Sequence, residues 1–155
     1  MMFSLDSLEV LFVIWAFLFQ IILIIHFALR KWRFDIVMRY GYIVYALSIP
    51  AVAISILLLL GGKPWYLWIG GFIYLVWAIY GYWVEYVQKI QWRTPPRWEI
   101  LVPYVFLYLA TVMFYWWPVG LISRPLWYVY AVLFAISTVL NTTSHKGPED
   151  GRQPV

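Results

Sequence analysis

Five long apolar runs constrain what this chain can fold into. They lie at about residues 8–29, 37–60, 65–87, 100–117 and 125–140. The first run contains no charged side chain between Glu9 and Arg30. An α-helix needs about 20 apolar residues to cross the roughly 30 Å hydrocarbon layer of a bilayer. Backbone polar groups cannot bond to water there, which favours helices. The sequence therefore predicts an all-α fold, a polytopic transmembrane helical bundle with five spans.

The composition is typical of a chain whose surface faces lipid. Hydrophobic residues make up 65% of the 155 residues and charged residues only 12%, whereas soluble domains carry about 25% charged residues. Too few polar side chains are present to cover a water-exposed surface. At this length we expect one bundle, over residues 1–140, without a second domain.

Proline and glycine mark the ends of the runs. Gly61-Gly62-Lys63-Pro64 ends the second run, and Pro95-Pro96 separates the third from the fourth. Pro118-Val119-Gly120 is expected to end the fourth run and Pro125 to begin the fifth. These last two runs are short, so a re-entrant pair is the alternative to two full spans. Pro50, inside the second run, predicts a kink.

The distribution of Lys and Arg predicts the orientation, because cytoplasmic loops carry the excess of basic residues. An N-outside arrangement places two basic residues outside, Lys63 and Arg124, and nine inside. The nine are Arg30, Lys31, Arg33, Arg39, Lys89, Arg93, Arg97, Lys146 and Arg152. We therefore expect an N-outside/C-inside protein of a prokaryotic plasma membrane, with loops 30–39 and 88–99 in the cytoplasm.

The tryptophans and the C-terminal segment agree with this arrangement. Of the 11 tryptophans, only Trp15 and Trp77 lie deep in an expected span; the others fall near span ends, where an amphipathic ring is favoured. From Asn141 to Val155 the sequence turns to Thr, Ser, Gly, Pro and acids. This composition predicts a disordered cytoplasmic tail over residues 141–155.

Polar and small residues recur at helical spacing within the runs, which predicts that they face the bundle interior. The inward residues are Tyr45, Ser48 and Ser55; Gly70, Tyr74, Ala78, Gly81 and Glu85; Tyr104, Tyr108, Thr111 and Tyr115; and Tyr130, Ser137 and Asn141. Two interpretations stay open. The hydroxyls form interhelical hydrogen bonds worth about 0.6 kcal/mol each, or they line a cavity for an amphipathic or aromatic ligand.

Glu85 is the most informative charged residue. Its spacing from Lys89 favours an i,i+4 ion pair, and Arg39 begins the second run at the same depth as a second candidate partner. In the alternative, Glu85 is a buried carboxyl that binds a cationic ligand or relays a proton. His26, one turn inside Arg30, is expected to be an interfacial hydrogen-bonded group. The candidate ligand-binding residues are Glu85, Tyr74, Tyr108, Tyr104, Thr111, Tyr45, Ser48, His26 and Arg39.

The sequence contains no pattern of a known catalytic centre. It has no cysteine, Ser-His-Asp set, H-E-x-x-H motif, phosphate loop or pair of intramembrane carboxylates. We therefore assign no catalytic and no metal-binding residue. A single histidine within the spans excludes bis-histidine haem ligation, and the cofactor is left unknown. Because the basic residues sit in short loops, nucleic acid is not an expected partner.

A short segment resembles a known family. Pro95-Pro96-Arg97-Trp98 followed by Leu107-Tyr108 is similar to the start of the first helix of the tryptophan-rich sensory proteins, which bind porphyrins and sterols. The resemblance covers about 14 residues and here precedes the fourth run. Length, five spans and tryptophan content are also similar. No family membership and no site residue are transferred from so short a match.

Two functions follow as hypotheses. In the first, the protein binds or moves a small hydrophobic, aromatic or amphipathic ligand in a tyrosine-lined bundle cavity. In the alternative, it is a non-catalytic structural subunit or assembly factor of a larger membrane complex. A membrane-embedded enzyme acting on lipid ranks third because no catalytic motif is present. The expected partners are the lipid bilayer, such a ligand, and either a second copy or a membrane-complex subunit.

Overall fold

A computed structural model describes residues 6–93 and 95–144, and these residues form helices and turns without a β-strand. Within them, five helical segments are long and apolar enough to cross a membrane. The segments are Ser7–Trp32, Ile43–Leu60, Trp65–Val87, Trp98–Ile122 and Arg124–Ser144. The predicted all-helical fold with five long apolar helices is therefore confirmed.

The described residues form seven α-helices and one π-helical turn, and of these only α2 lies outside the five long segments. They are α1 (Ser7–Trp32), α2 (Phe34–Tyr40), α3 (Ile43–Ala46), α4 (Ser48–Leu60), α5 (Trp65–Tyr82) with its π-helical continuation η1 (Trp83–Val87), α6 (Trp98–Ile122) and α7 (Arg124–Ser144).

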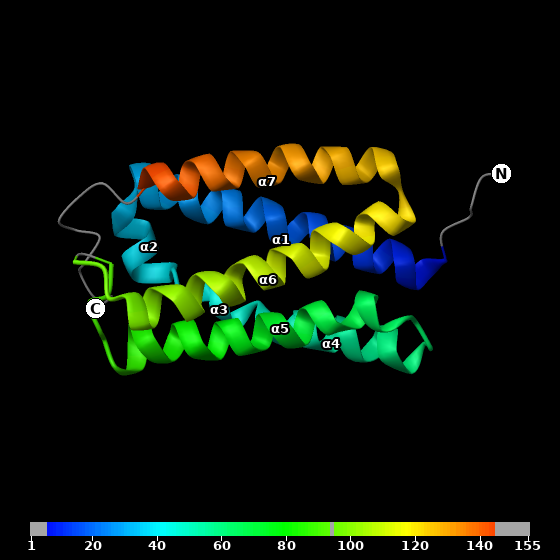
Figure 1. The fold of residues 1–155 in the computed structure, drawn as a ribbon, viewed down its shortest axis with the longest axis horizontal. Coiled ribbons are helices and arrows are strands. Elements are labelled where there is room, and N and C mark those ends of the chain that lie inside the picture. Colours follow the sequence, from blue (N-terminus) through cyan, green and yellow to red (C-terminus); the bar gives the residue numbers. More distant parts are fainter. Residues whose placement is uncertain (1–5, 94, 145–155) are drawn as a thin grey trace.

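The long helices lie side by side in an elongated bundle (Figure 1). Helix α7 packs along α1 and α5 packs along α4, whereas α6 begins beside α5 and ends beside α7. One end of the bundle holds the C-terminus of α1, helix α2 and residues 88–93 and 95–97. All the basic residues of the expected loops 30–39 and 88–99 lie there, and we call it the basic end. The opposite end holds Lys63 and Arg124.

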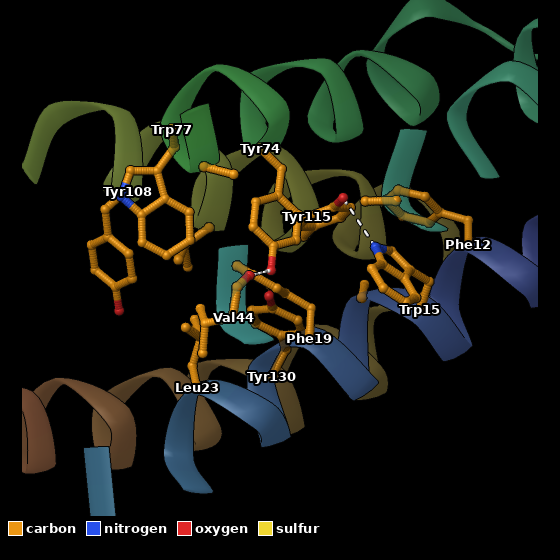
Figure 2. Packing of buried hydrophobic residues seen from close by; sticks show 14 of the residues in the cluster. Phe12, Trp15, Phe19, Leu23, Val44, Tyr74, Trp77, Tyr108, Tyr115 and Tyr130 are labelled. Carbon is orange, nitrogen blue, oxygen red and sulfur yellow. Dashed lines mark hydrogen bonds between the residues drawn. The ribbon is translucent and has the colours of Figure 1, made fainter. Parts of the chain in front are cut away.

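The core consists mainly of aromatic side chains from α1, α5 and α6 (Figure 2). Tyr74 is fully buried, stacks on Trp77 with ring centroids 5.5 Å apart, and donates its hydroxyl to the Val44 carbonyl. The Trp15 indole N–H donates to the Tyr115 hydroxyl over 3.0 Å. Hydrogen bonds of this kind satisfy polar atoms that burial removes from water.

The predicted inward faces are confirmed. The residues expected inside are buried or partly buried. On the opposite side of the third span, expected to face outward, Val76, Ile79 and Trp83 are exposed, and Phe72 is partly buried. In the second span, Tyr45, Ser48 and Ser55 are all buried.

Two predicted helix ends were wrong. Helix α6 does not stop at residue 117 but continues through Pro118 to Ile122, and α7 continues past residue 140 to Ser144. Proline removes a single backbone donor, a loss that an otherwise apolar helix tolerates. The two helices, of 25 and 21 residues, meet at Ser123, so each is long enough to span alone and the re-entrant alternative is not supported. Of the expected tail, residues 141–144 are helical, and 145–155 lie outside the described residues.

The second predicted span is interrupted. Its first part is the separate helix α2, which lies across the basic end (Figure 1), and a further break at Leu47 separates α3 from α4. Pro50 is the third residue of α4. Because a proline ring clashes with the carbonyl four residues before it, Pro50 disfavours a regular helix through Ala46. The predicted kink is present as this interruption.

At the opposite end of the bundle, Lys63 links the connection between α4 and α5 to the start of α1. Its ammonium group forms ion pairs with Asp6 and, over 3.0 Å, with Glu9. Asp6 also caps α1 by accepting the Leu8 and Glu9 N–H groups over 3.0 and 2.9 Å. One carboxylate thus serves both the start of α1 and the connection between α4 and α5.

Candidate functional site

Glu85 is the centre of a charged and hydroxyl-rich network near the basic end. Tyr45 donates its hydroxyl proton to Glu85 Oε2 over 2.7 Å, and Arg93 donates to Glu85 Oε1. The hydroxyls of Tyr45 and Tyr104 are 3.0 Å apart. A hydroxyl has one proton to donate, and that of Tyr45 is used on Glu85. Tyr104 is therefore the donor to Tyr45, and the chain runs from Tyr104 through Tyr45 to Glu85.

Glycine and a π-helical turn position this network. Gly81 lies one turn before Glu85, and a Cβ at Gly81 would lie 2.6 Å from Cε1 of Tyr45. The bare backbone at Gly81 therefore lets the Tyr45 ring lie against α5. Glu85 itself belongs to the π-helical turn η1, where the Gln88 N–H bonds to the Trp83 carbonyl over 2.8 Å. Such turns inside helices are frequent at functional sites.

The partner of Glu85 differs from both candidates that the sequence suggested. Arg93, beyond the end of η1, makes the ion pair, and its guanidinium lies 4.1 Å from the centre of the Trp92 ring. Lys89 adopts a positive φ of 51° in the turn that follows η1. Arg39 is exposed on α2 and lies 6.0 Å from the Tyr40 ring. The expected pairing with Lys89 or Arg39 was wrong because a local chain reversal brings Arg93 back over the helix end.

A cavity of about 420 Å³ adjoins this network. Its lining comes from the C-terminal half of α1, from α2, α3, α5 and η1, from the segment 90–93, and from α6 and α7. The polar lining includes His26, Arg30, Glu85, Gln91, Arg93 and Asn141. Aromatic and aliphatic side chains form the remainder, as is usual for a small-molecule pocket.

Three buried donors of the lining have no hydrogen-bond partner among the described residues. They are the indole N–H groups of Trp77 and Trp92 and the hydroxyl of Tyr108, in side chains only 2%, 3% and 7% exposed. Figure 2 shows the Tyr108 ring extending from α6 toward the side of α1 and α7. Ser137 lies toward this hydroxyl without reaching hydrogen-bond geometry. Because an unsatisfied buried group costs about 1–3 kcal/mol, these donors favour a polar occupant.

The cavity reaches the molecular surface between α6 and α7. Val105 and Leu109 on α6 and Thr138 on α7 line it and are also exposed. Gln91 of the segment 90–93 lines the cavity and is exposed as well. We call the exposed part of the lining formed by Val105, Leu109 and Thr138 the gap between α6 and α7. It lies on the side of the bundle, at two of the helices long enough to cross a membrane, which diverge toward the basic end (Figure 1).

Five of the nine sequence-predicted candidates line the cavity, namely Glu85, Tyr45, Tyr104, Tyr108 and His26. The other four lie outside its lining. The hydroxyls of Tyr74 and Thr111 are used on the carbonyls of Val44 and Leu107, Ser48 is buried beyond the cavity, and Arg39 is exposed.

Sequence reasoning missed Arg30, Trp77, Trp92 and Arg93 as lining residues. From the sequence, Arg30 and Arg93 were interpreted only as basic residues that indicate the orientation. Trp92 was interpreted only as an aromatic ring near the end of a span. Trp77 gave a usable signal, since it is one of the two tryptophans deep in a span.

Neither metal-binding geometry among the described residues nor comparison with known proteins assigns a function to this chain. Among residues 6–93 and 95–144, no three His, Asp or Glu side chains gather closely enough to hold a metal ion. Comparison with protein-family models, curated proteins and solved structures gives no match. The function must therefore be inferred from the geometry of the cavity.

Proposed function

We propose that this chain is an integral membrane protein with five spanning helices that binds or moves a small hydrophobic or amphipathic ligand in the cavity near the basic end. The observation that carries the proposal is the cavity itself, with its aromatic lining and its three buried donors that lack a protein partner.

Membrane insertion is supported by the outer surface of the bundle. Large aliphatic and aromatic side chains are exposed along every long helix, including Ile49, Leu60 and Phe106 at 71%, 79% and 69%. A soluble monomer rarely exposes contiguous apolar surface on this scale. Lipid removes the cost of that exposure. Of the nine described Lys and Arg residues, seven lie at the basic end and two, Lys63 and Arg124, at the opposite end, which supports the N-outside/C-inside orientation.

Ligand binding is supported by the size and chemistry of the cavity. Pockets for small molecules have volumes of about 300–1,000 Å³ and combine an apolar lining with a few placed polar groups. The cavity of 420 Å³ falls within this range. The Glu85 network and the three unsatisfied donors would supply the placed polar groups.

Tryptophan fluorescence tests the proposal, because Trp77 and Trp92 line the cavity. The purified protein is titrated with porphyrins, sterols, cationic aromatics and alkyl amphipaths. At least one class should quench saturably, and Tyr108→Phe should weaken its binding. The matched control Tyr128→Phe changes an exposed tyrosine of α7 that is not in the lining. A response that is flat across the panel, or equal loss in both variants, would contradict a cavity site.

The orientation has a separate test. An epitope tag at the C-terminus should be detected in inverted vesicles and protected in intact cells. Detection from outside intact cells would overturn the N-outside/C-inside assignment without affecting the cavity.

One feature favours the alternative role as a subunit of a membrane complex. Helix α7 fully buries only Tyr130 and Ser137, and 10 of its 21 residues are exposed and thus open to a protein partner as well as to lipid. Extraction in a mild detergent should then recover a second protein in fixed stoichiometry. A clean monomer or homo-oligomer that binds a ligand would contradict this role.

A further inference from the structure

Among the described residues, the charged side chains that line the cavity include more cations than anions. Arg30 and Arg93 contribute two guanidinium groups and Glu85 one carboxylate. Arg30 is 8% exposed, and it interacts electrostatically with the same carboxylate that Arg93 binds. Because guanidinium groups bind carboxylate and phosphate through charge-assisted hydrogen bonds, this lining suits an anionic group better than a cationic one.

The hydrogen-bonding capacity of the lining points the same way. An indole N–H donates and cannot accept, so Trp77 and Trp92 require acceptors. Glu85 already receives protons from Arg93 and Tyr45. The lining therefore offers these indole donors while its carboxylate is already hydrogen-bonded, and an oxygen-rich anion such as a carboxylate or phosphate complements the donors.

The gap between α6 and α7 suits an alkyl chain. The edges Val105 and Leu109 are apolar and are 39% and 40% exposed. At the opposite end, the Trp116 and Trp127 rings stack with centroids 5.1 Å apart and close the two helices together. A chain that leaves the cavity would therefore leave near the basic end and enter the hydrocarbon layer directly.

The volume limits how much of such a molecule is enclosed. The cavity of 420 Å³ lies near the lower end of the roughly 300–1,000 Å³ range of small-molecule pockets. A cavity of this size suits an anionic headgroup with the first part of one chain rather than a complete diacyl lipid.

We infer that the cavity takes an anionic amphipath from the bilayer, with its carboxylate or phosphate near Arg30 and Arg93 and its alkyl chain leaving between α6 and α7. This inference rests on the proposed function and assigns the ligand class. It replaces the earlier alternative in which Glu85 binds a cation, because Glu85 is neutralised from within the protein.

Three probes with matched chains test the charge selectivity, namely brominated stearate, a brominated alkyl trimethylammonium and a brominated alkyl alcohol. Bromine quenches tryptophan, and the component displaced by unlabelled stearate reports specific binding. Stearate should bind at roughly tenfold lower concentration than the other two, which corresponds to about 1.4 kcal/mol. If none of these probes and none of the porphyrins, sterols and cationic aromatics quenches saturably, the proposed function fails. If only a porphyrin, sterol or cationic aromatic does, the proposed function stands and the assignment of an anionic amphipath fails. If the cation or alcohol binds as well as stearate, only the anionic assignment fails.

Two pairs of variants locate the ligand. Arg30→Gln should weaken stearate binding roughly tenfold, whereas Arg33→Gln, an exposed arginine outside the lining, should not. Val105→Phe narrows the gap and should weaken binding, whereas Val102→Phe on the same helix lies outside the lining and should not. Equal effects within either pair would overturn the placement of that part of the ligand.

Glu85→Gln gives a test with the opposite sign. Removal of the carboxylate should strengthen stearate binding and weaken that of the cationic probe, provided that circular dichroism shows an unchanged helix content. Tighter binding of the cation would overturn the inference. Where this variant fails to fold, the Arg30 and Arg33 pair tests the charge preference alone. Replacing free stearate by vesicles of brominated phosphatidylglycerol then distinguishes a fatty acid from a phospholipid as the source.

Discussion

The ring of Tyr45 fills the space that a side chain at position 81 would occupy. A Cβ at Gly81 would lie 2.6 Å from Cε1 and 2.8 Å from the hydroxyl oxygen of Tyr45. The same hydroxyl reaches Glu85 one turn later on this side of the third span. The absence of a side chain at position 81 thus permits the Glu85 network.

Gly81→Ala is therefore expected to destabilise the protein. The added methyl group meets the Tyr45 ring, and overpacking of a filled interior typically costs about 1–3 kcal/mol. Unfolding in mixed micelles, followed by circular dichroism, measures the loss. In a Tyr45→Ala background the same change should cost much less, because the ring is gone. An equal cost in both backgrounds would show that the collision with Tyr45 is not its cause.

Tyr45→Phe should cost more stability than Tyr104→Phe. Tyr45 donates to a charged carboxylate, a bond worth about 1.5–3 kcal/mol, whereas Tyr104 loses only a neutral hydrogen bond worth about 0.5–1.5 kcal/mol. Tyr45→Phe also leaves Tyr104 without its acceptor. The same unfolding assay orders the two variants. The reverse order would mean that the direction of the hydroxyl chain has been assigned wrongly.

The ion pair at the opposite end predicts a dependence of stability on pH. The hydrogen bond from Lys63 lowers the pKa of Asp6, and the same bond raises the pKa of Lys63. Stability that depends on ionised Asp6 is complete above its ordinary pKa of about 3.9 and is lost as the pH falls through the lowered value. The contribution of charged Lys63 is complete below its ordinary pKa of about 10.4 and is lost above the raised value.

Thermal unfolding between pH 7 and acid pH tests this pair. Lys63→Gln should lower the midpoint at pH 7 and flatten its decline in acid. Asp6→Asn should reproduce the flattening while its amide oxygen still caps α1, so its helix content should exceed that of Asp6→Ala. An unchanged acid slope in Lys63→Gln would rule out the pair as the source of the pH dependence.

The gap between α6 and α7 can be probed with a nitroxide, because the chain contains no cysteine and a single introduced thiol is unique. A spin label on Val105→Cys should lose mobility when stearate is added. A label on Val102→Cys, one turn away and outside the lining, should not respond. Equal immobilisation at both positions would indicate general partition of stearate into the micelle.

Much of the architecture could be predicted from the sequence, and particular residues show why. Gly70, Tyr74, Ala78 and Gly81 recur at helical spacing, and all four are buried. Such a periodicity is a local property of the chain and is therefore visible in the sequence. The helix ends were less predictable. Pro118 is a helix breaker in water, whereas in the lipid environment proposed for this chain the backbone of an interrupted helix would find no alternative partner.

The contacts within the site could not be predicted from the sequence alone. Glu85 was recognised as the central charge, yet its partner Arg93 lies eight residues away, a spacing that no i,i+4 rule anticipates. The reversal at Lys89, with its positive φ, brings Arg93 there. Trp92 carries no sequence signal of burial, because an interfacial ring and a cavity wall have the same composition.

Ser123 is the single residue between α6 and α7, and the stacked rings of Trp116 and Trp127 join the two helices near it. This turn is therefore the pivot about which α6 and α7 can rotate relative to each other. Val105 lies 18 residues before Ser123, about 27 Å away along a helix. A rotation of about 5° at the pivot moves Val105 by about 2.4 Å over that length. Spanning helices adapt to bilayer thickness by tilting. We therefore expect bilayer thickness to change the width of the gap between α6 and α7.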